Sequence, residues 1–167
     1  LQYCEHLVLT RKLVKDKASL KDTIFAAIHR FDYDLEKQGA SAMKPWFMII
    51  DGSCLAVALA DEDDEGCREL LSELAQRCRS IVACRVSPSQ KSELVDFLRD
   101  NRYLSRVLAI GDGAHDVGMI KAADVGVGVY GQEGTAAVSA ADYAIAQFKF
   151  LAPLILRHGQ FNYIRLS

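Results

Sequence analysis

The spacing of apolar positions predicts helices that alternate with short strands along the chain. Apolar residues recur at helical spacing over residues 18–38, at Leu20, Ile24, Ala27, Ile28, Phe31 and Leu35. Short apolar runs predict buried strands at 46–50, 81–86, 107–110, 124–129 and 141–145. Helical segments are predicted at 69–77, 87–101, from 114, at 133–140 and at 148–165. In the segment 87–101, Leu94, Val95 and Leu98 are expected to point inward. This alternation is typical of a parallel sheet covered by helices on both faces.

Local signals mark several element ends. Ser87 is a favoured N-cap and Pro88 a favoured first helical residue, so a helix begins there. Asp51-Gly52 is a turn signal that could open a hairpin into residues 55–59. The acidic run 60–66 could bind a metal, but a solvated loop entering a helix is favoured, because acids suit a helix N-terminus.

Composition narrows the class of protein. The 167 residues are 50% hydrophobic and 25% charged, enough for one soluble domain with a core. A net charge of −2 with scattered cations argues against nucleic acid as a partner. Five cysteines without CxxC or zinc-type spacing are typical of buried thiols in a reducing compartment. No signal peptide or membrane-length apolar run is present, and the start without Met leads us to expect a piece of a longer protein.

The strongest chemical signal is GDGAHD at residues 111–116. It follows a predicted strand and opens a helix, so Asp112 and Asp116 would lie at the carboxyl end of that strand, where open α/β sheets bind ligands. Gly113 lets the backbone approach a ligand. Two carboxylates beside a phosphate-favouring helix N-terminus would repel unless a cation lay between them. Mg²⁺ is the natural candidate, so the pattern predicts a metal-dependent phosphate site.

Two further loops would open onto the same crevice if their strands are parallel neighbours. In the first, Lys91 lies in the opening turns of its helix, against the helix dipole, so it is either a phosphate ligand or a surface lysine. Arg85 is the next cation of that loop, with the same two interpretations. In the second, glycines 126, 128 and 131 indicate either a nucleotide loop or close strand–helix packing, and packing is favoured. His115 could be a solvated residue, a donor to the site or a pH-sensitive group.

Several strings together resemble the haloacid dehalogenase superfamily, and within it the type IV, phospholipid-flippase branch of the P-type ATPases. They are FMIIDGSCLAVAL at 47–59, CRVSPSQK at 84–91, AIGDGAHDVGMIKAADVGVGVYGQEG at 109–134, and DYAIAQFKFL with LRHGQFNYIR at 142–165. The resemblance implies a three-layer, Rossmann-like α/β fold with a mainly parallel sheet. Residues 1–45 would be a variable helical segment, and 46–167 the C-terminal part of the phosphorylation domain, its last helix leading toward the membrane stalk.

The resemblance also implies roles for individual residues. In such pumps ATP phosphorylates an Asp in a DKTGT motif, and the acyl-phosphate is then hydrolysed. Asp112 would be the main Mg²⁺ ligand, Asp116 its supporting carboxylate, and Lys91 the phosphate-holding lysine. Arg85 resembles an ATP-contacting arginine, and His115 takes the place of an Asn that holds phosphate or nucleotide. Phosphoryl transfer depends mainly on such positioning and charge neutralisation.

The chain departs from the family pattern in ways that limit the expected activity. DKTGT and TGD are both missing, so the nucleophile strand is absent and we expect no ATPase turnover from this chain alone. That strand is central in the family, so its loss would leave an open sheet edge, filled by a local segment such as residues 6–10 or by self-association. His115 in place of Asn would suit either a working or a degenerate site.

Three functions follow from these observations. The first is the Mg²⁺- and phosphate-binding half of a pump that couples ATP hydrolysis to phospholipid translocation, with an accessory subunit as a further partner. It would be a soluble cytoplasmic domain of a multi-pass membrane protein. The second is a soluble phosphatase of the same superfamily, for which the DxD motif is missing before Trp46. The third is a non-catalytic, flippase-like scaffold.

Overall fold

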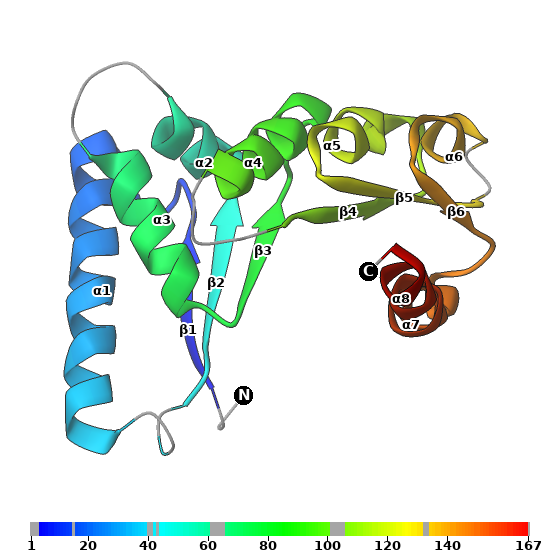
Figure 1. Ribbon diagram of the computed structural model, residues 1–167. Coiled ribbons are helices and arrows are strands. Elements are labelled where there is room, and N and C mark those ends of the chain that lie inside the picture. The colour runs from blue at the N-terminus through cyan, green and yellow to red at the C-terminus, as the bar shows by residue number, and fades with distance from the viewer. Residues whose placement is uncertain are drawn as a thin grey trace. The chain divides into compact units, whose positions relative to one another are not determined.

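Two compact units, Leu1–Gln90 and Lys91–Ser167, make up the chain. The computed structural model describes residues 4–14, 16–39, 42, 44–60, 66–100, 106–131 and 134–166. Each unit has its own three-stranded parallel sheet, in the order β1-β2-β3 and β4-β5-β6 (Figure 1). The predicted α/β class with a parallel sheet is confirmed. The division between the units does not coincide with the predicted boundary at residues 45 and 46, which stays a prediction.

The first unit contains strands and helices largely as predicted, with residues 52–59 as an exception. Its elements are β1 (Glu5–Leu9), α1 (Lys17–Gln38), β2 (Trp46–Asp51), α2 (Gly52–Leu59), α3 (Cys67–Arg77) and β3 (Ser80–Cys84), followed by the first residues of α4 (Pro88–Asp100). β2 is the central strand, and Val8, Ile49 and Val82 lie in register across the three strands. The acidic run at 61–65 and residue Asn101 lie outside the described residues, so the expectations for them are not addressed.

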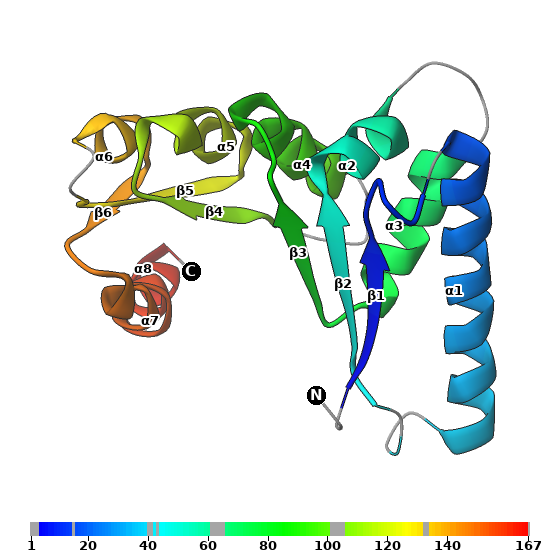
Figure 2. The ribbon, with the colours of Figure 1, turned by 180° about the vertical axis from the view of Figure 1, so that it is seen from behind.

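The core of the first unit lies between its sheet and its helices. Along β2 the side chains of Trp46, Met48 and Ile50 are buried, whereas Phe47 and Ile49 on the opposite face are half-buried. Helices α1 and α3 pack against each other on the buried side (Figures 1 and 2). Alternate burial along a strand is what one helix-covered face produces, because successive side chains point to opposite faces of the sheet.

The predicted hairpin after Asp51 is wrong, because residues 52–59 form helix α2 and β2 pairs in parallel on both sides. Asp51 caps this helix: its Oδ1 accepts hydrogen bonds from the Cys54 backbone N–H at 2.8 Å and the Ser53 hydroxyl at 2.7 Å. The residues after the cap are mostly apolar, and Cys54, Leu55, Ala58 and Leu59 are buried. An Asp before Gly therefore acts here as a helix N-cap rather than as a turn residue.

The second unit contains most of α4 and the elements that follow it. They are β4 (Leu108–Gly111), the 3-10 helix η1 (Ala114–Asp116), α5 (Val117–Ala122), β5 (Val125–Val129), α6 (Ala136–Ala140) and β6 (Tyr143–Ile145). On α4, Val95 and Phe97 are buried and the predicted inward residues Leu94 and Leu98 are half-buried. Helix α6 begins at Ala136, three residues later than predicted, and Gln132 and Glu133 lie outside the described residues.

Close packing in the second unit depends on glycine. A Cβ on Gly128 would lie 2.6 Å from Val138 Cα and 2.8 Å from the Ala137 carbonyl oxygen. Since both are backbone atoms of α6, only glycine lets that helix approach β5 this closely. Gly126 meets Ile120 of α5 in the same way. Close strand–helix packing, the favoured interpretation of these two glycines, is thus confirmed.

The chain ends in a continuous helical segment. It consists of η2 (Phe148–Phe150), α7 (Leu151–Pro153), the π-helix η3 (Leu154–Gly159) and α8 (Gln160–Leu166), as predicted for residues 148–165. Large apolar side chains along it, such as Leu156, Phe161 and Ile164, are exposed. Among the described residues, no helix has both the length and the apolar character needed to cross a membrane.

Four strand edges carry no partner among the described residues: those of β1 and β3 in the first sheet, and those of β4 and β6 in the second. β3 pairs only with β2, and β4 pairs only with β5. The condition that the strands before these three loops are parallel neighbours is therefore met by β4 and β5 but not by β3 and β4, which belong to different sheets. The candidate segment 6–10 does form a strand, β1, but it pairs with β2 and leaves the edges of β3 and β4 free.

Candidate functional site

Lys91 and Asp116, which are far apart in sequence, form a direct ion pair in the second unit. Lys91 Nζ lies 2.7 Å from Asp116 Oδ1 and donates a hydrogen bond to it. Helix α4 supplies the lysine, and η1, at the carboxyl end of β4, supplies the carboxylate. Asp116 is buried, and a quarter of the Lys91 side chain is exposed. The lysine near a helix N-terminus is therefore stabilised by a carboxylate from a neighbouring element.

The carboxyl group of Asp116 is held in its ionised form. Burial opposes ionisation, but the hydrogen bond and charge of Lys91 outweigh it, and the Gly113 backbone N–H, 3.4 Å from Oδ2, adds to the effect. Together they lower the pKa of Asp116 below its ordinary value. A buried anion beside one ammonium group keeps that ammonium at a fixed position, which is what a phosphate-holding lysine needs.

Asp112 lies at the end of β4 in a different environment. It is exposed, and its carboxylate makes no hydrogen bond or ion pair with any described residue. The loop after β5 approaches it closely, since a Cβ on Gly131 would lie 3.2 Å from Asp112 Cβ and 3.3 Å from its Oδ2. β4 and β5 are parallel neighbours, which brings these two loops together as predicted. The free carboxylate is available to a ligand.

Gly111 is required by the position of Asp116. A Cβ at residue 111 would clash with Asp116 Cβ and would lie 2.7 Å from its Cγ. Contacts that short are not tolerated, so any other residue would displace the buried carboxylate from Lys91. The first glycine of the GDGAHD string thus makes room for its last aspartate.

His115 lies at the rim of this cluster. Its side chain is 46% exposed, and Nε2 is 3.6 Å from Asp116 Oδ2. That separation is longer than a hydrogen bond, so His115 acts on Asp116 through charge only when it is protonated.

Arg85 belongs to the first unit and follows β3 directly. Its backbone φ is +55°, in the left-handed region that non-glycine residues rarely adopt. With Asp51 and Gly52 it lines a hollow of about 730 Å³ at the carboxyl ends of the first unit's strands. The structure thus brings Lys91, Asp112, His115 and Asp116 together, and it places Arg85 in another unit.

The family model described as "Phospholipid-translocating P-type ATPase C-terminal" matches residues 138–167. The phospholipid-transporting ATPase tat-1 of Caenorhabditis elegans is 45% identical over 161 residues, which cover 93% of this chain and 13% of the relative. The human phospholipid-transporting ATPase IH is 37% identical over 171 residues, covering 96% of this chain and 15% of the relative. The chain belongs to the phospholipid-transporting P-type ATPases.

The region of similarity is one part of these ATPases, because the chain spans about an eighth of the tat-1 relative's length. Phospholipid-transporting ATPase 1 of Arabidopsis thaliana is 49% identical over 120 residues, which cover 72% of this chain and 10% of that relative. A solved catalytic domain of the CPx-ATPase CopB-B covers 69% of this chain and 38% of its own at 23% identity, with a TM-score of 0.34. That TM-score is too low to support an argument from structure.

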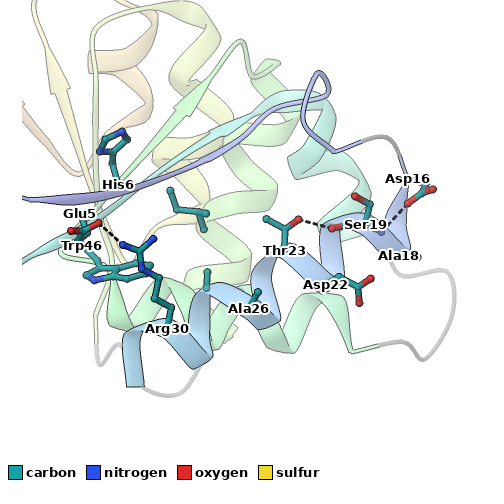
Figure 3. Close-up of a pocket in the computed structure, with 12 residues that line it drawn as sticks. Glu5, His6, Asp16, Ala18, Ser19, Asp22, Thr23, Ala26, Arg30 and Trp46 are labelled. Atoms are coloured by element: carbon teal, nitrogen blue, oxygen red, sulfur yellow. Dashed lines mark hydrogen bonds and ion pairs between the residues drawn. The ribbon is translucent and has the colours of Figure 1, made fainter. Parts of the chain in front are cut away.

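Two features of this chain were missed by sequence reasoning. One is the capping role of Asp51, which its position before an apolar run could have indicated. The other is a hollow of about 740 Å³ between β1 and α1 (Figure 3), lined by Glu5, Arg30 and Trp46 among others. The Arg30 guanidinium there pairs with Glu5 at 3.0 Å and lies over the Trp46 ring. The cation of this hollow is therefore already neutralised.

Proposed function

We propose that this chain is the Mg²⁺- and phosphate-binding half of the phosphorylation domain of a phospholipid-transporting P-type ATPase. In the whole protein it would act in ATP hydrolysis through an aspartyl-phosphate, coupled to phospholipid translocation. The observation that carries the proposal is the free Asp112 carboxylate at the end of β4 beside the fixed Lys91–Asp116 pair. The relatives' names support ATP and phospholipid as substrates.

The donor chemistry of the cluster fits Mg²⁺. Among the described residues, no group of three or more His, Cys, Asp or Glu side chains could hold a metal. Mg²⁺ in phosphoryl-transfer sites, however, usually takes one or two carboxylates and completes its shell with water and phosphate oxygens. Asp112 would be the direct ligand and Asp116 the supporting carboxylate. The ion would supply charge neutralisation for the phosphoryl group.

The other residues of the site would bind and orient the substrate. Lys91, held by Asp116, would place its ammonium against a phosphoryl oxygen. His115 would take the place of the amide that holds phosphate or nucleotide, and Arg85 would contact ATP. The nucleophilic Asp would come from a segment of the whole protein outside these 167 residues, because no DKTGT string occurs here.

The metal assignment can be tested on this chain without any turnover. Mn²⁺ in place of Mg²⁺ should broaden the amide NMR signals of Gly111, Gly113 and Gly131, and excess Mg²⁺ should reverse the broadening. Asp112→Asn should abolish the effect. The matched control Asp22→Asn changes an exposed carboxylate on α1 and should leave it intact. Equal broadening in the native chain and in Asp112→Asn would exclude Asp112 as the ligand.

The catalytic assignment requires the whole ATPase. There, Asp112→Asn and Lys91→Met should each lower phosphoenzyme formation by a factor of ~10² or more, as expected for loss of one group that stabilises transferred charge. Asp22→Asn should retain the native level. This chain alone should show no ATPase turnover, because a covalent aspartyl-phosphate needs the nucleophile. Turnover by this chain that Asp112→Asn removes would contradict the assignment.

A non-catalytic scaffold is the second candidate, favoured only by His115 in place of the family's Asn. Phosphoenzyme formation by the whole protein, measured for the native form and for His115→Asn, separates the two functions. A working pump should retain phosphoenzyme formation in both forms. A scaffold should form no phosphoenzyme with either residue.

A further inference from the structure

The carboxyl ends of β1, β2 and β3 surround a second candidate site, in the first unit. The hollow of about 730 Å³ there is lined by Thr10, Arg11, Lys12, Asp51, Ser53 and Arg85, among other residues. Arg11 and Lys12 follow β1, Asp51 and Ser53 lie at the junction of β2 and α2, and Arg85 follows β3. Three consecutive loops of one parallel sheet therefore meet at one concave surface, where such sheets bind ligands.

The cations of this hollow have no protein partner among the described residues. The side chains of Arg11, Lys12 and Arg85 are exposed and make no ion pair or hydrogen bond there. Elsewhere in the same unit the arginines on helices are paired: Arg30 with Glu5, and Arg77 with Asp32 and Glu73. Three unpaired cations around one hollow leave a positive potential that favours an anionic ligand.

The carboxylate in this hollow forms no ion pair with those cations, because its oxygens accept hydrogen bonds elsewhere, and its single charge set against three cations leaves the lining of the hollow positive. Asp51 Oδ1 accepts from the Ser53 hydroxyl and the Cys54 N–H, and Oδ2 accepts from the Arg11 backbone N–H at 2.9 Å. These bonds cap α2 and fix the loop that carries Arg11 and Lys12. The two side chains are thereby presented to the hollow rather than to the carboxylate.

We propose that Arg11, Lys12 and Arg85 form an oligophosphate-binding site at the carboxyl ends of β1 and β3. Neighbouring strands lie ~4.8 Å apart, so the cations after β1 and β3 are anchored about two strand spacings apart. A ligand with two or more linked phosphates spans that separation better than a single phosphate. The volume also lies within the ~300–1,000 Å³ typical of small-molecule sites.

This site is independent of the proposed Mg²⁺ site. It needs no metal and uses neither Asp112 nor Lys91, and Arg11 and Lys12 have no role in the proposed reaction. Arg85 is shared between the two proposals, so Arg11 and Lys12 carry the test. Phosphates could come from a free oligophosphate or from a nucleotide, and the experiment distinguishes these sources.

The test is a titration of this chain with inorganic tripolyphosphate in a buffer containing a chelator, followed by amide NMR and calorimetry. We expect saturable binding, with the largest shifts at Thr10, Arg11, Lys12, Ser53 and Arg85. ATP that binds as tightly as tripolyphosphate would mean that only the phosphates are recognised. ATP that binds more tightly would make the ligand a nucleotide. No saturable binding of either would overturn the proposal.

Matched variants separate a site from general charge attraction. Arg11→Gln/Lys12→Gln should weaken binding at least tenfold. The control Lys44→Gln/Arg79→Gln removes the same charges from exposed side chains at the amino ends of β2 and β3, and should bind like the native chain. Equal weakening in both double variants would overturn the proposal, as would loss of binding in Asp112→Asn. Far-UV circular dichroism of each variant checks that the fold is retained.

Discussion

Lys91 on α4 donates a hydrogen bond of 2.7 Å to Asp116 at the end of β4, which joins two candidate site residues into one partly buried pair. The pair stabilises the second unit and also fixes the position of the ammonium group. Lys91→Met would leave the buried Asp116 carboxylate without its cation, at a cost of roughly 2 kcal/mol in the free energy of unfolding. Hydrogen exchange of the α5 amides measures this loss.

The control for this prediction is Lys121→Met, which removes an exposed lysine of α5 and should cost less than ~0.5 kcal/mol. A double-mutant cycle with Asp116→Asn should return a coupling energy of ~1–2 kcal/mol. Additive effects of the two substitutions would show that the pair contributes nothing to stability.

The lowered pKa of Asp116 predicts how stability depends on pH. A carboxyl group with a lower pKa in the folded state than in the unfolded state stabilises the fold above its ordinary pKa of 3.8. That stability is lost as the pH falls below 3.8 through the lower, folded-state pKa. The difference in unfolding free energy between the native chain and Asp116→Asn should therefore be constant from neutral pH to about pH 5 and shrink below it. A difference in unfolding free energy that grows as the pH falls would show that folding raises the pKa of Asp116 instead of lowering it.

Local patterns predicted the elements of this chain well, but not the partners of its strands. Helix α1 follows directly from apolar spacing, and Leu20, Ile24 and Ile28 are indeed buried. The error at Asp51-Gly52 arose because the same two residues serve as turn or N-cap, and only the apolar run after them distinguishes the two. Which strand lies beside β3 or β4 depends on contacts between distant segments, and periodicity carries no information about those.

The candidate site was predictable residue by residue but not as a set of contacts. Spacing and resemblance singled out Lys91 and Asp116 separately, and the ion pair between them required the fold. Arg11 and Lys12 attracted no prediction, because two cations after a short apolar run are ordinary in sequence. Their importance comes from the absence of a described partner for either side chain in the folded unit.

Asp51 should contribute measurably to the first unit through its cap on α2. Asp51→Ala removes the acceptor of the Cys54 N–H and of the Arg11 N–H, so we expect a loss of about 1–2 kcal/mol. Asp51→Asn retains a capping oxygen and should lose less. Trp46, the single tryptophan of the chain, is buried in this unit, so its fluorescence during urea unfolding reports the change. Equal losses of unfolding free energy in Asp51→Ala and Asp51→Asn would exclude the helix cap as the cause.

Gly128 should be intolerant of a methyl group. Gly128→Ala places a Cβ 2.6 Å from Val138 Cα, and backbone cannot move aside as a flexible side chain can. We expect a cost of ~1–3 kcal/mol, seen as faster hydrogen exchange in β5 and α6. Gly159→Ala is the control, because its Cβ would meet nothing closer than 3.7 Å, and it should be neutral or stabilising. Unchanged exchange in Gly128→Ala would mean that α6 can shift away from β5.

The free edges of β3 and β4 should make this chain associate with itself. Each edge presents unpaired backbone groups, and Val82 on β3 and Leu108 on β4 are 50% and 40% exposed. Charged residues on an edge strand oppose strand addition, so Val82→Lys/Leu108→Lys should associate less than the native chain at the same concentration. Light scattering over a concentration series measures the mass. Leu13→Lys, which adds a lysine at a 67% exposed position outside both strands, should associate like the native chain. A native chain that stays monomeric throughout would contradict the prediction, because the edges of β3 and β4 would then be stable in water without a partner.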